Sequence, residues 1–204
     1  MIVTRLLLVR HAEPEEDARG RCYGRLDVGL SPAGLAQATA LGEALAALGP
    51  MTVVSSPARR ALDTASRIGP AAVDERLREL DFGELEGRTY AEIERERPEL
   101  FARWMRTPTE VVFPGGEGFE HLRVRACAAA AALRAEHAGD RVAVVAHGGV
   151  VRAIVAEALG LPSRSIFRLD VGHARLSVVD WFDDEPVVRL LNGSPHDVPT
   201  HSLG

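Results

Sequence analysis

The sequence has few aromatic residues, only two cysteines and no long hydrophobic run. Aromatic residues make up 5% of 204 positions, so aliphatic side chains and alanine must form most of the core. Cys22 and Cys127 lie far apart and form no CxxC pair, which favours two free thiols in a reducing compartment. The apolar stretch 6–9 is too short for a signal peptide, and no run reaches transmembrane length. We therefore expect a cytoplasmic protein that does not insert into a membrane.

An excess of positive charge is also missing. The chain has 24 basic and 29 acidic residues, which gives a formal net charge of −5. Such a balance provides no general attraction for nucleic acid or for an anionic membrane surface. Every basic residue is an arginine, so an anion-binding site would have to be local and built from a few arginine side chains.

The order of strand and helix patterns indicates one α/β domain. A chain of 204 residues suits a single compact domain, which we expect over residues 1–192, with a loose tail over 193–204. Strand and helix patterns alternate, which predicts a mostly parallel sheet with helices on both faces. Strands are expected at 5–10, 51–54, 142–145, 166–169, 174–181 and 187–191. Helices are expected to begin at Ser31-Pro32 and Ser56-Pro57 and to cover 89–105, broken before Pro98, then 118–136 and 149–159.

Three of the expected strands end in residues that can handle a phosphoryl group. His11 follows the first strand, Arg59 and Arg60 open the helix after the second, and His147 follows the strand at 142–145. Ligands of open α/β sheets bind outside the carboxyl ends of the strands, so we expect these side chains to lie together.

The residue types match the needs of phosphoryl transfer. Arginine holds phosphoryl oxygens with a rigid fork that stays charged at any working pH. One neutral imidazole can attack phosphorus, and nearby arginines keep it neutral by depressing its pKa below about 6.5. A second imidazole can donate a hydrogen bond to the oxygens. The glycines after His147, first Gly148, allow the backbone to approach an anion closely.

Five segments of the sequence resemble motifs of the histidine phosphatase superfamily, which includes the cofactor-dependent phosphoglycerate mutases. Arg10-His11-Ala12 is similar to the RHG signature, with alanine in place of glycine. The turn at Pro114 is similar to PGGES, with Gly118 in place of serine. The matches run in the family order from residue 6 to about residue 180 and include the segments 8–13, 55–65, 77–87, 114–117 and 146–149.

The resemblance implies a three-layer phosphoglycerate-mutase-like fold and a role for each matching residue. His11 is expected to be the nucleophile, with Arg10 and Arg60 holding the phosphoryl oxygens; Arg59 is the less favoured alternative to Arg60. His147 is expected to hydrogen-bond the transferring group.

The expected general acid is Glu79, with Glu84 on the same loop as the alternative. Tyr23 and Gly24 fall where the family places a loop that touches the phosphate, and Gly148 is the further backbone contact. The sequence from Arg21 to Asp27 is similar to that of alpha-ribazole phosphatases.

The resemblance further implies a metal-independent phosphatase that takes a small phosphorylated substrate and needs no cofactor. A mutase or an inactive phospho-ligand-binding module are the alternatives, and the chain could be a monomer or a homodimer.

Phe101 and Trp104 fit core packing better than a substrate lid. Five histidines show no metal-ligand spacing, and of these only His173 is a candidate neighbour of the site; they are His121, His137, His173, His196 and His201.

Overall fold

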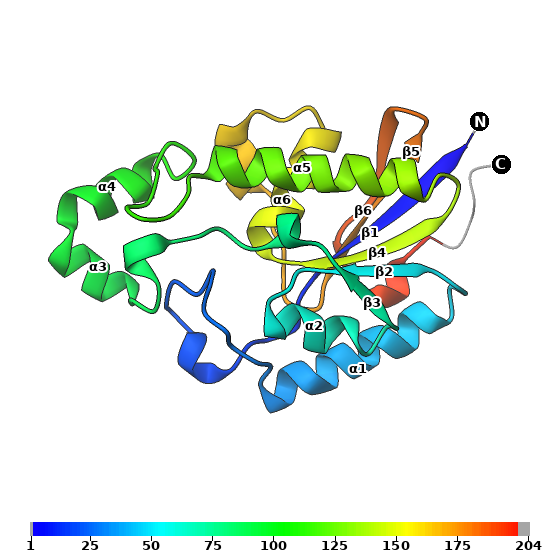
Figure 1. The fold of residues 1–204 in the computed structure, drawn as a ribbon, viewed down its shortest axis with the longest axis horizontal. Coiled ribbons are helices and arrows are strands. Elements are labelled where there is room, and N and C mark those ends of the chain that lie inside the picture. Colours follow the sequence, from blue (N-terminus) through cyan, green and yellow to red (C-terminus); the bar gives the residue numbers. More distant parts are fainter. Residues whose placement is uncertain (1, 200–204) are drawn as a thin grey trace.

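The computed structural model describes residues 2–199 and contains a six-stranded sheet covered by helices on both faces (Figure 1). The strand order is β3-β2-β4-β1-β5-β6. β1, β2, β3 and β4 run parallel, and β5 and β6 form an antiparallel hairpin at one edge. This confirms the predicted α/β fold with a mostly parallel sheet. The strands are β1 Val3–Arg10, β2 Thr52–Ser55, β3 Ala71–Val73, β4 Arg141–Ala146, β5 Leu176–Phe182 and β6 Glu185–Gly193.

Residues 2–199 contain six α-helices, four of which cover the sheet. α5 and α6 cover one face and α1 and α2 cover the other, while α3 and α4 project from the body at the end away from the two termini (Figure 1). None of the helices within residues 2–199 is long and apolar enough to cross a membrane. The helices are α1 Pro32–Ala46, α2 Arg59–Ala65, α3 Tyr90–Glu96, α4 Pro98–Arg106, α5 Phe119–Glu136 and α6 Gly148–Ala158.

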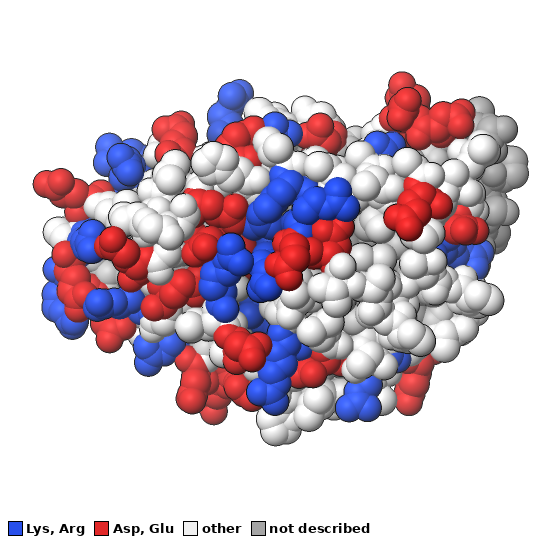
Figure 2. Space-filling view, viewed as in Figure 1, with Lys and Arg blue, Asp and Glu red and all other residues white. Residues whose placement is uncertain are grey.

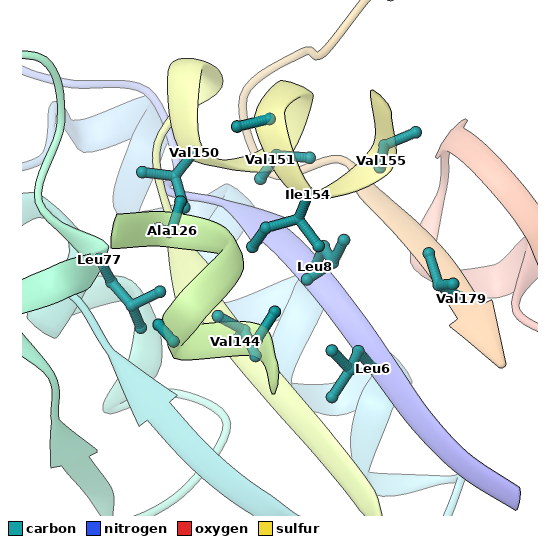
Figure 3. Close-up of a cluster of buried hydrophobic side chains, with 14 of the residues drawn as sticks. Leu6, Leu8, Leu77, Ala126, Val144, Val150, Val151, Ile154, Val155 and Val179 are labelled. Atoms are coloured by element: carbon teal, nitrogen blue, oxygen red, sulfur yellow. The ribbon is translucent and has the colours of Figure 1, made fainter. Parts of the chain in front are cut away.

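The core is divided between the two faces of the sheet by the alternation of side chains along each strand. Leu6 and Leu8 of β1 pack with Val144 and Ile154 in the cluster under α5 and α6 (Figure 3). The intervening Leu7 belongs to the second cluster, on the α1 side of the sheet. Successive residues of a strand point to opposite faces, so a strand that is apolar throughout becomes buried on both sides. Both faces of β1 and β4 are therefore packed against helices, which positions the ends of these strands.

Local capping explains where two of the helices begin. Ser31 caps α1 as predicted, and its Oγ accepts a hydrogen bond from the Gly34 N–H at 2.9 Å. Thr89 and Glu92 form a capping box at the start of α3.

The predicted start of α2 at Ser56-Pro57 is wrong, because the helix begins at Arg59 and has no side-chain cap. The Ser56 hydroxyl contacts His147 instead and makes only a 3.4 Å contact with the Ala58 N–H. Ser56, which the sequence pattern predicts as a helix cap, therefore contacts His147 at the end of β4 instead.

Three further expectations about the fold are corrected. The segment predicted as a strand at 166–169 is mostly a 3₁₀ helix, Ser163–Arg168, and β3 was not predicted. The tail expected to be loose from residue 193 is built into the domain, because β6 extends to Gly193 and Val198 is buried against the second core cluster. That expectation is wrong for residues 193–199, whereas 200–204 lie outside the described residues.

Candidate active site

The ends of three parallel strands bring the predicted residues together. Arg10 is paired with Ala146 in the register of β1 and β4, so His11 and His147 are the next residues on adjacent strands. The His11 N–H donates to the Ala146 carbonyl at 2.9 Å, which continues the ladder past the last paired residues. Ser56 follows β2 in the same way and donates its N–H to Val145 at 2.9 Å.

The predicted nucleophile, His11, is buried and neutral. Its side chain is 2% exposed, and its Nδ1 donates to the Ala12 carbonyl at 2.7 Å, so the lone pair is on Nε2. Burial lowers the pKa of His11 well below its ordinary value, and the nearby positive charge of Arg60, followed by that of Arg10, lowers it further. A neutral imidazole with a free Nε2 is the form that can attack phosphorus.

Two arginines lie beside this imidazole, and each keeps an N–H group that has no acceptor among the described residues. Arg60 is fully buried and donates to the carbonyls of Leu26 and Gly24 at 3.0 and 3.1 Å. Arg10 donates to the Val171 carbonyl at 2.6 Å. The Nε atoms of both arginines have no hydrogen-bond partner within the described residues.

The alternative arginine, Arg59, lies outside this arrangement. Its side chain is 58% exposed and pairs with Asp63 along the surface of α2 at 3.7 Å. The structure therefore places Arg60, and not Arg59, beside His11.

The second histidine, His147, has one occupied and one available ring nitrogen. Its Nε2 lies 2.7 Å from the Ser56 hydroxyl, while its buried Nδ1 has no partner in the described part of the chain. The rings of His147 and His11 have centroids 5.2 Å apart. Burial, followed by the charge of Arg60, lowers the pKa of His147 well below its usual range, so it too is neutral.

The loop at Tyr23 and Gly24 completes one wall of the site. The Tyr23 ring lies 5.0 Å from the Arg60 guanidinium and lines the same cavity as His11. A side chain at position 24 would put its Cβ 1.8 Å from the Leu80 carbonyl oxygen, so only glycine fits. Both residues lie where the sequence placed them.

Gly148 and Arg152 lie next to Arg10. A Cβ at position 148 would lie 2.9 Å from the Arg152 Nη1 and 3.7 Å from the Arg10 guanidinium carbon. Arg152 donates from its Nε to the Leu169 carbonyl, and burial followed by the charge of Arg10 lowers its pKa. Sequence reasoning missed Arg152; its spacing of four residues from Gly148, about one helical turn, was the available signal.

The predicted general acid, Glu79, faces the same cavity. This cavity of about 100 Å³ is lined by Glu79 and by Arg10, His11 and Tyr23 among others. The two carboxylate oxygens of Glu79 accept hydrogen bonds from the N–H groups of Leu80 and Gly149, at 2.9 and 3.1 Å. The backbone thus fixes the carboxylate beside the nucleophile.

The alternative acid, Glu84, points elsewhere. Its side chain is 55% exposed and accepts a hydrogen bond from Arg97 at 2.7 Å. The cavity that contains His11 is not lined by Glu84.

A half-buried ion pair links the Glu79 segment to α5. Arg125 of α5 pairs with Glu117 and donates to the carbonyls of Arg78 and Glu79, the latter at 3.1 Å. Glu117 in turn accepts from the Asp81 N–H at 3.1 Å. The sequence did not reveal this contact of Arg125 with the Glu79 segment, although Glu117 lies in the predicted glycine turn.

The remaining candidate residues from the sequence lie in the core, beside the site or at the surface. Trp104 is 8% exposed and packs with Phe101, Phe82 and Phe113, which confirms core packing. His173 lies beside His11, with ring centroids 5.3 Å apart. His121 and His196 are exposed, His137 is half-buried, and His201 lies outside the described residues.

Charge on the surface is mixed. Figure 2 shows arginine side chains near the middle of this face with acidic side chains beside them, and no extended region of one sign. Within residues 2–199, no group of three or more histidine, cysteine or acidic side chains is placed to hold a metal ion.

Comparison with known proteins shows the family. A model of the histidine phosphatase superfamily (branch 1) matches residues 6–194, so this chain belongs to that superfamily. Among curated proteins, a putative phosphoserine phosphatase 2 of Hydrogenobacter thermophilus is 31% identical over 197 residues, which cover 94% of this chain and 97% of the relative.

Two solved structures show the same fold over nearly the whole chain. A putative alpha-ribazole-5'-P phosphatase of Escherichia coli has a TM-score of 0.86 and 26% identity, covering 93% of this chain and 96% of its own. A mycobacterial glucosyl-3-phosphoglycerate phosphatase has a TM-score of 0.85 and 31% identity, covering 94% and 100%. The chain spans about half the length, 54%, of three mycobacterial proteins that are 37% identical to it over 196 residues.

Proposed function

We propose that this chain is a metal-independent phosphatase that hydrolyses small phosphomonoesters through a phosphohistidine on His11. The observation that carries the proposal is the state of His11, which is buried and neutral, with Nδ1 committed to the Ala12 carbonyl and two arginines beside it. That arrangement leaves Nε2 as the nucleophile and surrounds it with donors for an anion.

The reaction proceeds in two displacements. The His11 Nε2 forms a bond to phosphorus as the bond to the ester oxygen breaks, and Glu79 gives its proton to that leaving oxygen. Water then attacks the phosphorus of phospho-His11 and gives a proton to Glu79, and the bond between phosphorus and Nε2 breaks to release phosphate and the free imidazole. Arg10, Arg60 and the Nδ1 of His147 hold the phosphoryl oxygens throughout, with Ser56 donating its hydroxyl proton to His147 Nε2 so that Nδ1 carries the remaining proton.

Hydrolysis is favoured over a mutase reaction by the size of the site. A mutase must hold a bisphosphorylated intermediate while it turns, which needs a second set of cationic contacts. The cavity at His11 is about 100 Å³, and the arginines at its mouth are Arg10 and Arg21, of which Arg21 already donates to the Gly87 carbonyl at 2.8 Å. Hydrolysis of phospho-His11 needs contacts for one phosphoryl group only. Return of that group to the substrate would need a second set of cationic contacts for the bisphosphorylated intermediate.

The substrate class follows from the same cavity and from the relatives. The site fits one phosphoryl group, and the adjoining lining of Arg21, Phe82 and Tyr90 receives the leaving alcohol. The named activities of the relatives make phosphoserine, glucosyl-3-phosphoglycerate and alpha-ribazole phosphate the first substrates to test. We further propose a cytoplasmic enzyme with no nucleic-acid partner, active as a monomer or a homodimer.

The experiment measures phosphate release from a panel of phosphomonoesters by the wild type and by His11→Ala. We expect release that is unaffected by a strong chelator and is absent in His11→Ala, with no interconversion of 2- and 3-phosphoglycerate. Activity that is lost on chelation and restored by a divalent ion would defeat the metal-independent mechanism. A mutase rate above the phosphatase rate would instead favour the mutase.

A further inference from the structure

A third imidazole lies as close to the nucleophile as the second histidine does. The ring centroid of His173 is 5.3 Å from that of His11, against 5.2 Å for His147. His173 comes from the loop that joins the 3₁₀ helix at 163–168 to β5, after the motif at 146–149. The proposed mechanism gives it no task.

The loop that carries His173 is fastened to the nucleophile itself. The Ala174 N–H points to the carbonyls of Arg10 and His11, at 3.2 and 3.3 Å. The Arg10 guanidinium donates to the Val171 carbonyl at 2.6 Å. The residues on both sides of His173 are therefore tied to the strand end that carries the nucleophile, which fixes His173 relative to His11.

A second anchor holds the same loop from β6. Asn192 accepts from the Gly172 N–H and donates to the Asp170 carboxylate, both at 2.7 Å. Ala174 has a φ of 52°, in the left-handed region that side-chain-bearing residues other than asparagine and aspartate rarely adopt. Strained backbone of this kind persists where the surroundings impose it, and it is concentrated at functional sites.

The His173 side chain brings an unused hydrogen-bonding atom to the site. Its Nε2 is buried and has no partner among the described residues, as is the case for the Nε atoms of Arg10 and Arg60 and for the Nδ1 of His147. Burial, followed by the charge of Arg10, lowers the pKa of His173 to about 4, so the ring is neutral near pH 7 and carries one N–H. These four atoms belong to the residues that surround His11.

We propose that His173 is a further catalytic residue, whose imidazole N–H binds an oxygen of the transferring phosphoryl group. The ligand is the phosphoryl dianion, and the contact persists on phospho-His11 and on the product phosphate. No bond to His173 forms or breaks. The inference rests on the proposed function, because it assigns a contact in the same site.

The test compares two substitutions that separate hydrogen bonding from packing. His173→Phe keeps a flat ring against His11 but removes the N–H, whereas His173→Gln keeps an N–H donor. The side chain borders a neighbouring cavity of about 220 Å³, which shares Tyr23 with the cavity at His11 and gives both replacements room. The readouts are the inhibition constants of inorganic phosphate and orthovanadate, together with kcat and KM on an aryl phosphate.

We expect His173→Phe to weaken phosphate and vanadate binding by about 10-fold or more, the usual loss for one hydrogen bond to a charged group. His173→Gln should recover part of that loss. The control is His121→Gln, an exposed histidine on α5, which should bind both anions as the wild type does. Equal losses in the Phe and Gln variants would mean that His173 contributes by packing and not by a hydrogen bond. Unchanged binding in both variants would mean that His173 does not contact the phosphoryl group.

A measurement on the wild-type protein tests the same contact without any substitution, in case a variant does not fold. The ¹⁵N resonances of the His173 ring should shift when inorganic phosphate is added, and resonances that stay in place while phosphate inhibits would overturn the contact. Because these readouts report anion binding, they are separable from the proposed function, which fails if phosphate release persists in His11→Ala.

Discussion

Arg59 and Arg60 are neighbours in the chain, but only Arg60 is fully buried beside the nucleophile. We predict that Arg60→Lys lowers kcat/KM by about 10²-fold or more, because lysine cannot hold the loop carbonyls and a phosphoryl oxygen together. Arg59→Lys is the matched control and should change kcat/KM by less than about twofold, since its ion pair is at the surface. Steady-state kinetics on an aryl phosphate measures both. Equal losses in the two variants would contradict the assignment of Arg60.

Glu79 and Glu84 form a second pair of similar residues with different surroundings. We predict that Glu79→Gln slows turnover by about 10²–10⁴-fold, the usual contribution of general acid catalysis. The loss should shrink for substrates with good leaving groups, which need little protonation. Glu84→Gln removes only an exposed contact with Arg97 and should keep wild-type turnover. A leaving-group dependence seen in Glu84→Gln instead would move the general acid to position 84.

At the scale of elements, the segment that carries Glu79 depends on α5 for its position. Arg125 holds the carbonyls of this segment from α5, whereas Arg123, two residues earlier, pairs with Glu120 and Glu157 at the surface. We predict that Arg125→Gln lowers kcat by about 10- to 100-fold, because a small misplacement of a catalytic group has that effect. Arg123→Gln should leave kcat unchanged.

The measurement for this pair is kcat on good and poor leaving groups, with thermal unfolding recorded alongside. If Arg125→Gln lowers the unfolding temperature and leaves kcat intact, Arg125 supports the fold alone and does not position Glu79.

The elements that the sequence predicted well are those with strong local signals. β1 and β4 contain apolar runs, at 6–9 and 142–146, and α1 and α3 begin at capping residues, so their positions followed from propensity and pattern. β3 was missed because it has three residues, of which two are exposed. Ile166 and Leu169 are buried while Phe167 is exposed, a spacing of three that fits a 3₁₀ helix better than the predicted strand.

The candidate site was predictable in the parts that strand ends and motifs define. His11, His147, Arg60 and Glu79 lie where the order of strands and the family resemblance placed them. His173 could not be assigned because it reaches the site through loop contacts with β1 and β6. Long-range contacts of this kind leave no periodic pattern in the sequence.

At the scale of the whole molecule, the buried histidines couple the site to stability. The pKa values of His11 and His147 lie well below the ordinary value and that of His173 is about 4, so all three stay neutral in the folded chain as the pH falls. In the unfolded chain they take up protons below about pH 6.5. The unfolded state then binds more protons, so the free energy of unfolding falls as the pH drops from that value towards the folded-state pKa values.

We predict a decrease of about 1.4 kcal/mol per pH unit for each such histidine between about pH 6 and pH 5. Urea unfolding at a series of pH values measures it. Burial raises the pKa of Glu86, which acts in the opposite direction, so the comparison with His173→Phe isolates one histidine. The variant should show a shallower slope than the wild type, and an identical slope would mean that His173 is charged in the folded protein.

The central claim is a covalent phosphohistidine on His11, and trapping that species tests it most directly. A reaction with a labelled phosphomonoester, stopped by rapid denaturation without acid, should yield a phosphoenzyme that is stable to base and labile to acid. Peptide mapping should place the label on His11, and His11→Ala should give none. A label that persists in His11→Ala, or that maps to Ser55 or Ser56, would contradict the account.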